Sequence, residues 1–304
     1  MFLLLLLACT KAEPERPGTL FRDQVLEHDG LERRYHFYET HIEGERPLVL
    51  LLHGGGGTID NHVGLGRVDW PHQVWFDIVD EEGLHLLVPQ GVDEQWNDCR
   101  VECTRCGDAD DIGFLEALLD DKEATGRVDR SRVYATGESN GGFMTQRLVA
   151  EAPERIAAGG VVIALRPENT ECEDQEMAMP MLYQVGTTDA AIPYEGGSSD
   201  SNIVVLSAQD TAAHWAGVNG CEEQTRSTDF PDLDAEDQST VREEVWTCSS
   251  APLVVQHMEG AGHVAPSIEV EVSGFWEGIA GIQNHDIEGA REIWAFFEGQ
   301  DRPR

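Results

Sequence analysis

The sequence has little positive charge. Lysine occurs only twice, as Lys11 and Lys122, and 21 basic residues stand against 57 acidic ones, which gives a formal net charge of −36 at pH 7. An excess of this size repels polyanions, so the composition argues against nucleic acid and against an anionic membrane surface as partners. The net charge bears on the solubility of the protein and does not indicate which reaction it catalyses.

The chain also lacks an apolar run long enough to cross a bilayer, which takes about 20 residues. Its first apolar run, residues 2–8, is short and typical of the end of a signal-peptide h-region. The stretch Leu6-Leu7-Ala8-Cys9 resembles a bacterial lipobox, in which the cysteine is lipidated after cleavage. We therefore expect residues 1–19 to act as signal and tether, and the protein to be exported. It would be either secreted or lipid-anchored at the bacterial cell envelope through Cys9, unless the apolar start is accidental.

No linker rich in proline, glycine or serine divides the chain, and no internal repeat is visible. The 304 residues include 40% hydrophobic ones, enough for a large core. A single α/β domain of about 200–250 residues is common, so we expect residues 20–304 to form one catalytic domain.

The seven cysteines are an odd number, and lipidation of Cys9 would account for one of them. An even set of six then suits three disulfides in an oxidising compartment. Four of the six have a spacing close to a zinc-binding pattern, but no nearby histidine completes one, so we expect no metal site. The six are Cys99, Cys103, Cys106, Cys172, Cys221 and Cys248.

Strand and helix patterns alternate along the chain. Two extended runs, 20–28 and 31–38, are joined by Asp29-Gly30, a strong hairpin signal. Residues 48–52 form a continuous apolar run, typical of a strand buried on both faces of a parallel sheet. Further strands are expected at 84–89, 132–136, 156–164, 179–185 and 252–258, and helices at 71–82, 110–124, 139–151, 204–218 and 286–298. The pattern predicts an α/β fold whose mostly parallel sheet has helices on both faces.

A Gly-x-Ser-x-Gly sequence centred on Ser139 lies between an expected strand and an expected helix. In that context it is a nucleophile elbow rather than a helix cap, because glycines at 137 and 141 allow a sharp turn that exposes the serine. A serine hydroxyl needs a base, and in this fold the chain order is Ser, then Asp or Glu, then His. His263 follows the last strand in a glycine-rich loop, and Asp189 follows the strand 179–185. We expect Ser139, Asp189 and His263 to form a catalytic triad.

The glycine run 54–57 follows the buried strand 48–52. Glycine allows backbone N–H groups to approach a tetrahedral oxyanion, and we expect Gly55 and Asn140 to supply them. Gly54 or Gly56 could replace Gly55. A phosphate-binding role does not fit, because no Gly-Lys-Ser/Thr sequence follows.

Together these motifs resemble the secreted feruloyl and acetylxylan esterase and polyhydroxybutyrate depolymerase group of α/β-hydrolases. The resemblance covers roughly residues 20–298, and it implies an α/β-hydrolase fold, a serine esterase without a cofactor and a disulfide between Cys221 and Cys248. One departure is that Val264-Ala265-Pro266 keeps a proline after the histidine and loses the tryptophan that often precedes it. The matching stretches are residues 51–56, 88–91, 96–98, 110–114, 137–144, 186–189, 192–194, 219–221, 262–263 and 286–297.

The resemblance implies hydrolysis of feruloyl or acetyl esters of the plant-polysaccharide type. Asn140 after the nucleophile favours this over a polyhydroxybutyrate-type depolymerase, whose members more often carry alanine there. We expect Trp96 and Gly54 to contact the substrate, an ester either free or bound to a polymer. A serine peptidase and a non-catalytic surface lipoprotein remain as alternatives, and neither the acyl group nor the oligomeric state follows from the sequence.

Overall fold

The computed structural model describes residues 16–98, 100–101, 103, 106–172, 177–199 and 203–302. Cys9 and most of the expected signal and tether therefore lie outside the described residues, as does Cys99. Within the described part, no helix combines the length and the apolarity that crossing a membrane requires.

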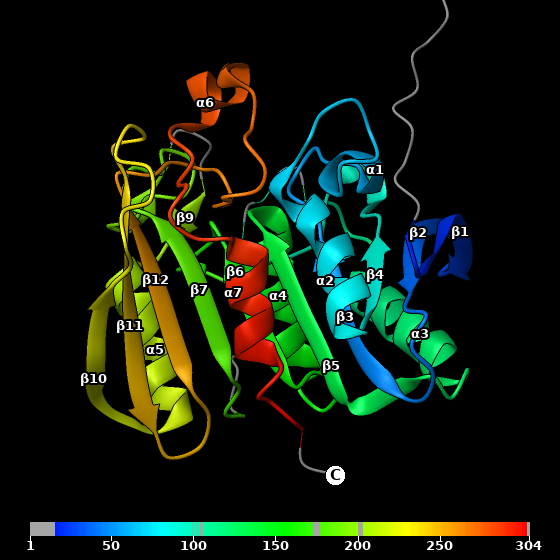
Figure 1. Cartoon of the computed structure of the whole chain (residues 1–304). Helices are drawn as coiled ribbons and strands as arrows, with labels where there is room; N and C mark the ends of the chain where they lie inside the picture. Colours follow the sequence, from blue (N-terminus) through cyan, green and yellow to red (C-terminus); the bar gives the residue numbers. More distant parts are fainter. Residues whose placement is uncertain are drawn as a thin grey trace, which may run out of the picture.

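In chain order the elements (Figure 1) are β1 Thr19–His28, β2 Leu31–Glu39, β3 Arg46–Leu52, α1 Ile59–His62, η1 Pro71–Val74, α2 Trp75–Glu82, β4 His85–Pro89, η2 Val92–Glu94, α3 Asp111–Glu123, β5 Val128–Glu138, α4 Asn140–Glu151, β6 Ala158–Val162, β7 Met181–Gly186, β8 Gly197–Ser198, β9 Val204–Val205, α5 Ala208–Asn219, β10 Cys221–Asp229, β11 Thr240–Cys248, β12 Leu253–Glu259, α6 Gly274–Ala280 and α7 Gly289–Phe297.

One sheet of ten strands runs through the structure in the order β1-β2-β4-β3-β5-β6-β7-β12-β11-β10. Strands β4, β3, β5, β6, β7 and β12 are parallel, whereas β1, β2, β11 and β10 pair antiparallel at the two edges. The predicted fold class, a mostly parallel sheet with an N-terminal β-hairpin, is confirmed. Parallel strands bring their carboxyl ends to one edge of the sheet, where sites in such folds lie.

The core has two halves, one on each face of the sheet. Strand β3 shows this directly, because Leu48, Leu50 and Leu52 pack with α3, α4 and α5, while Val49 and Leu51 pack with α2 and α7. Helices α3, α4 and α5 cover one face of the sheet, and helices α2 and α7 cover the other face (Figure 1). The uninterrupted apolar sequence of β3 thus follows from its burial on both sides.

The N-terminal hairpin turns at Asp29 and Gly30, whose φ angles are 48° and 76°. Positive φ at both central positions gives a two-residue turn the twist that neighbouring strands require. The helix expected at 204–218 begins later, at Ala208, because the Ser207 side chain accepts a hydrogen bond from the backbone of Asp210 at 2.9 Å and caps it there. Residues 204–205 instead form β9.

The antiparallel pair β10 and β11 was not anticipated from the sequence. Its strands, CEEQTRSTD and TVREEVWTC, carry many polar residues and lack a clear alternation. The pair extends the sheet beyond β12, and Cys221 and Cys248 face each other across it and are joined by a disulfide. A second disulfide joins Cys103 to Cys106, and Cys172 is disulfide-bonded as well.

The two described disulfides close chain segments of very different length, and we expect their removal to have different effects. The Cys221–Cys248 bridge spans 27 residues and the Cys103–Cys106 bridge spans 3. On the chain-entropy model the longer loop stabilises the fold by about 3.5 kcal/mol. Cys221→Ser with Cys248→Ser should therefore lower the free energy of unfolding by about that amount in a urea titration. The matched pair Cys103→Ser with Cys106→Ser should lower it much less, and equal losses would contradict the loop-length argument.

Candidate active site

Ser139 lies in the turn between the end of β5 and the start of α4. Its φ and ψ are 52° and −117°, a strained conformation for a residue with a side chain. The turn is possible because two neighbours are glycine: a Cβ atom on Gly137 would lie 2.5 Å from the carbonyl oxygen of Gly141, and one on Gly141 would collide with the carbonyl of Leu52. The backbone thus holds the Ser139 side chain partly exposed at the carboxyl edge of the sheet.

The structure brings the three predicted triad residues together. His263 Nε2 lies 2.9 Å from Ser139 Oγ, and His263 Nδ1 lies 2.6 Å from Asp189 Oδ2. The other oxygen of Asp189 accepts two backbone N–H bonds, from Ala191 and Ile192, both at 2.8 Å. A carboxylate fixed in this way orients the imidazole so that Nε2 can accept the proton of the serine.

Close packing of two loops places the acid next to the base. Gly186 ends β7, and a Cβ atom there would lie 2.5 Å from the carbonyl oxygen of Gly262, so glycine at 186 lets the loops after β7 and β12 touch. Thr188 secures the contact by donating its backbone N–H at 3.0 Å and its hydroxyl at 2.9 Å to the carbonyl of Ala261.

The glycine-rich loop after β3 faces the same edge. The N–H groups of Gly56 and Gly57 are already bound to the carbonyls of Glu94 and Gly54, at 2.8 and 3.0 Å. Among the described residues, no carbonyl accepts a hydrogen bond from the N–H of Gly55 or of Gly54 before it, so either N–H can be offered to a developing oxyanion. The other predicted donor, the N–H of Asn140, lies in the first turn of α4, where backbone N–H groups have no acceptor within the helix.

His53, just before this loop, was not singled out from the sequence. Its Nδ1–H donates to Gly54 O at 2.8 Å, and its Nε2 accepts from Gly91 N and Gln90 Nε2, both at 2.9 Å. Complete burial lowers the pKa of His53 to about 3, so the ring is neutral and keeps this pattern at neutral pH. His53 therefore ties the glycine loop to the segment after β4. The Pro-Gln-Gly sequence there was part of the family resemblance, but nothing local indicated its partner.

The expectation that Trp96 binds substrate is wrong, because its side chain has no exposed surface. Its indole N–H donates to His53 O at 3.0 Å, its ring packs 5.0 Å from that of His53, and its backbone N–H donates to Asn140 Oδ1 at 2.8 Å. Trp96 thus braces the glycine loop and the start of α4 from behind. Gly54 remains partly exposed at the site.

Helix α6 adds an apolar surface near the histidine loop. Gly262 N and His263 N donate to the carbonyls of Ile282 and Ala280, at 2.8 and 2.6 Å, so the end of α6 is bound directly to the backbone of the base. The helix lies at the top in Figure 1. Its large apolar side chains are exposed by 72%, 36% and 65%, for Phe275, Trp276 and Ile279 in that order.

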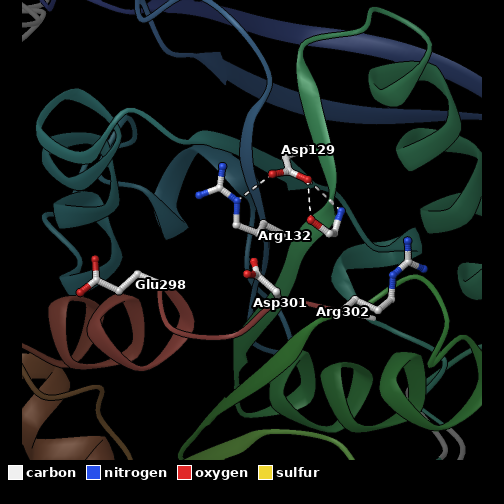
Figure 2. Close-up of a pocket in the computed structure, with 6 residues that line it drawn as sticks. Asp129, Arg132, Glu298, Asp301 and Arg302 are labelled. Atoms are coloured by element: carbon white, nitrogen blue, oxygen red, sulfur yellow. Dashed lines mark hydrogen bonds and ion pairs between the residues drawn. The ribbon is translucent and has the colours of Figure 1, made fainter. Parts of the chain in front are cut away.

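A separate hollow lies at the opposite end of β5 (Figure 2). It has a volume of about 470 Å³, and it is polar, with Asp129 already bound to Arg132 at 2.8 Å. Because this hollow lies at the start of β5 and Ser139 follows its end, it does not contribute to the triad site. Its lining residues are Asp129, Ser131, Arg132, Glu298, Asp301 and Arg302.

No family model matches the chain, but related proteins do. NocK from Nocardia uniformis subsp. tsuyamanensis, named as a candidate esterase, is 29% identical over 236 residues, which cover 73% of this chain and 66% of NocK. Feruloyl esterase B from Piromyces equi is 31% identical over 123 residues, covering 38% of this chain and 23% of that enzyme. The poly(3-hydroxybutyrate) depolymerase from Ralstonia pickettii is 27% identical over 190 residues, covering 59% and 33%. The chain thus spans less than two thirds of the length of each of these relatives.

Solved structures agree on the fold. The acetyl xylan esterase from Aspergillus awamori superposes with a TM-score of 0.59 at 16% identity, covering 92% of this chain and 99% of that one. A thermostable esterase superposes with a TM-score of 0.56 at 15% identity, covering 94% and 64%. By sequence the chain resembles the feruloyl esterases and poly(3-hydroxybutyrate) depolymerases, and by structure it has the α/β-hydrolase fold.

Proposed function

We propose that the chain is a serine carboxylic-ester hydrolase with Ser139, His263 and Asp189 as its triad. The observation that carries the proposal is the unbroken hydrogen-bond chain from Ser139 Oγ through His263 to Asp189, at 2.9 and 2.6 Å. It is supported by the strained elbow that presents the serine and by the free N–H groups beside it. A non-catalytic surface protein would need neither feature.

The reaction would proceed through an acyl-enzyme. His263 takes the proton of Ser139 as Oγ attacks the ester carbonyl, and the negative oxygen of the tetrahedral intermediate is held by the N–H groups of Gly55 and Asn140. His263 then gives the proton to the leaving alcohol. A water, deprotonated by the same imidazole, hydrolyses the acyl-serine and regenerates the enzyme, while Asp189 stabilises the imidazolium in both halves.

Ser139→Ala should remove several orders of magnitude from kcat on p-nitrophenyl acetate, because the nucleophile is lost. Alanine keeps the small side chain at the elbow, so the circular dichroism spectrum and the thermal midpoint should stay close to those of the wild type. Asp189→Asn serves as a second variant and should also lower kcat strongly, since an amide favours the wrong imidazole tautomer. Near-wild-type turnover by folded Ser139→Ala would refute the assignment. A fluorophosphonate probe should label the wild type and leave Ser139→Ala unlabelled.

We further propose that the esters are feruloyl or acetyl groups of the plant-polysaccharide type. Two observations support this choice over a polyhydroxybutyrate-type depolymerase. Several relatives are named feruloyl esterase, and an asparagine follows the nucleophile. A serine peptidase is less well supported. Comparing hydrolysis of an ester and of an amide with the same acyl group would distinguish a peptidase from an esterase.

Helix α6 supplies apolar contact area for a hydroxycinnamoyl ring. The chain after His263 runs Val264-Ala265, both buried, where the family that it resembles often has a tryptophan before the proline. Trp276, 36% exposed on a helix that is bound to the backbone of His263, can take over that contact. Its ring also packs against Trp70, with centroids 5.8 Å apart, which limits its movement.

Trp276→Ala should lower kcat/KM for methyl ferulate about tenfold, since an aromatic contact contributes about 0.5–1.5 kcal/mol beyond area burial. The value for p-nitrophenyl acetate should change little, because its acyl group has no ring for the helix to contact. Leu233→Ala removes another exposed apolar side chain, at 59% exposure, and is the matched control. Equal losses on both esters, or a wild-type preference for a long-chain ester or a hydroxybutyrate oligomer, would overturn the substrate choice and leave the triad untouched.

For location we propose export, with a lipid anchor at Cys9. The supporting observations are the lipobox-like stretch and the disulfides, which persist in oxidising compartments. Several acyl chains on one cysteine anchor stably where a single chain does not.

Metabolic labelling with a palmitate analogue in a bacterial host should therefore tag the wild type and leave Cys9→Ser unlabelled. Both forms should carry the same esterase activity, since Cys9 precedes the catalytic residues by more than a hundred positions. Labelling of both forms to the same extent would eliminate the anchor while leaving export possible.

A further inference from the structure

A buried cluster of metal-ligating side chains lies directly behind the nucleophile. His62 ends α1, His72 lies in η1 and Glu138 ends β5, immediately before Ser139. All three side chains are buried, and one ligand atom of each lies within 4.8 Å of the others. Neither the proposed esterase reaction nor the sequence motifs assign any role to this cluster.

The spacing of these atoms is close to that of a zinc site. Zinc takes His nitrogens at about 2.0–2.1 Å and carboxylate oxygens at about 2.0–2.2 Å in tetrahedral geometry, which places neighbouring ligand atoms roughly 3.4 Å apart. His62 Nδ1 lies 3.5 Å from Glu138 Oε1, and His72 Nε2 lies 3.1 Å from Glu138 Oε2. The two contacts use different oxygens of Glu138, so a cation shared by all three groups would require the side chains to shift.

Hydrogen bonding explains the cluster less completely. The 3.5 Å separation is at the outer limit of a hydrogen bond, and His62 Nε2 is buried without a hydrogen-bond partner within the described structure. A cation bound at Nδ1 would replace this long contact with a ligand bond, while Nε2 would keep its present surroundings.

The carboxylate also has an outer hydrogen-bond donor. Trp70 donates its indole N–H to both oxygens of Glu138, at 3.0 and 3.1 Å, the outer hydrogen bond that a ligating carboxylate usually receives.

We propose that His62, His72 and Glu138 bind one divalent cation, zinc by ligand type, in a structural site behind the nucleophile. Two imidazoles and one carboxylate form a ligand set that zinc takes, with a fourth position for solvent. This differs from the expectation, drawn from the cysteines alone, that the protein holds no metal.

The site would act on the oxyanion loop and not on the ester. A Cβ atom at Gly54 would lie 3.2 Å from Glu138 Oε1, so the carboxylate supports the first residue of the glycine loop. Fixing Glu138 with a cation therefore fixes both the backbone leading into Ser139 and the loop opposite it. The effect on catalysis would be one of positioning.

Two other clusters of similar composition do not offer a site. Cys103 and Cys106, next to Asp98, are joined to each other in a disulfide. In the cluster of Asp23, His36 and Asp60, the two carboxylates already pair with Arg34 and Arg22, in that order, and are partly exposed.

The test is zinc binding by the full chain, measured without reference to activity. After treatment with a chelator and dialysis, the wild type and Ser139→Ala should each take up one equivalent of Zn²⁺ by calorimetry and elemental analysis, with a rise in thermal midpoint. Co²⁺ in place of Zn²⁺ should give the visible absorption of nitrogen and oxygen ligation without thiolate bands. His62→Ala and His72→Ala should each lower the affinity at least tenfold, and Trp70→Phe should lower it about tenfold or more by removing the outer hydrogen bond.

His85→Ala is the control, because His85 is equally buried but lies outside the cluster, where it contacts Thr40 and Arg127. It should lose stability and keep the zinc affinity of the wild type. Should either cluster variant fail to fold, His72→Gln and the wild-type titration still decide the question. No zinc binding by the wild type, or binding that His62→Ala and His72→Ala leave unchanged, would overturn the proposal. Because Ser139→Ala is predicted to bind zinc normally, the cation site and the esterase assignment can fail independently.

Discussion

The structure around the site depends on one steric constraint, the meeting of three backbones at the elbow. The end of β5, the start of α4 and the end of β3 approach so closely that Gly137 and Gly141 have no room for a Cβ atom. This contact forces Ser139 into its positive φ and points its hydroxyl away from the sheet. It also places the glycine loop after β3 beside the first turn of α4, so the nucleophile and the candidate oxyanion donors are set by the same contact.

Such a close approach strains the backbone, and buried polar side chains around it hold the loops in place. His53, fixed as a neutral ring by its burial, joins the glycine loop to the segment after β4. Trp96 joins His53 to Asn140. On the other side, Glu138 and its donors support Gly54. The side chains that touch substrate are few, and a larger set of buried ones keeps them in position.

The buried acidic groups around this arrangement are paired with donors. They include Asp189, which is bound to His263 and two backbone N–H groups, Glu138, which is bound to Trp70 and His72, and Asp98, which is bound to Arg100 and Asn140. Each carboxylate is thereby satisfied by donors, and the apolar surface of α6 lies next to the histidine loop. An uncharged ester can approach this edge without the repulsion that the surface imposes on polyanions.

Much of this could be predicted from the sequence, because the decisive signals are local. The alternation of apolar strands with helices follows from burial of each strand on both faces, as β3 shows. The elbow is readable because its glycines lie two positions on either side of Ser139, and Asp189 and His263 follow strand ends whose order in the chain is fixed by the fold. In each case the residue and the reason for it are a few positions apart.

Only the tertiary structure decided the rest. Trp96 has a sequence context that suggests substrate contact, yet its burial depends on His53 and Asn140, more than forty positions away on either side. The polar strands β10 and β11 are strands because each pairs with a neighbour and because Cys221 lies opposite Cys248. The cluster of His62, His72 and Glu138 forms from three elements that no local pattern connects. Close contacts between distant segments depend on how the chain packs, and neither periodicity nor motif spacing records that packing.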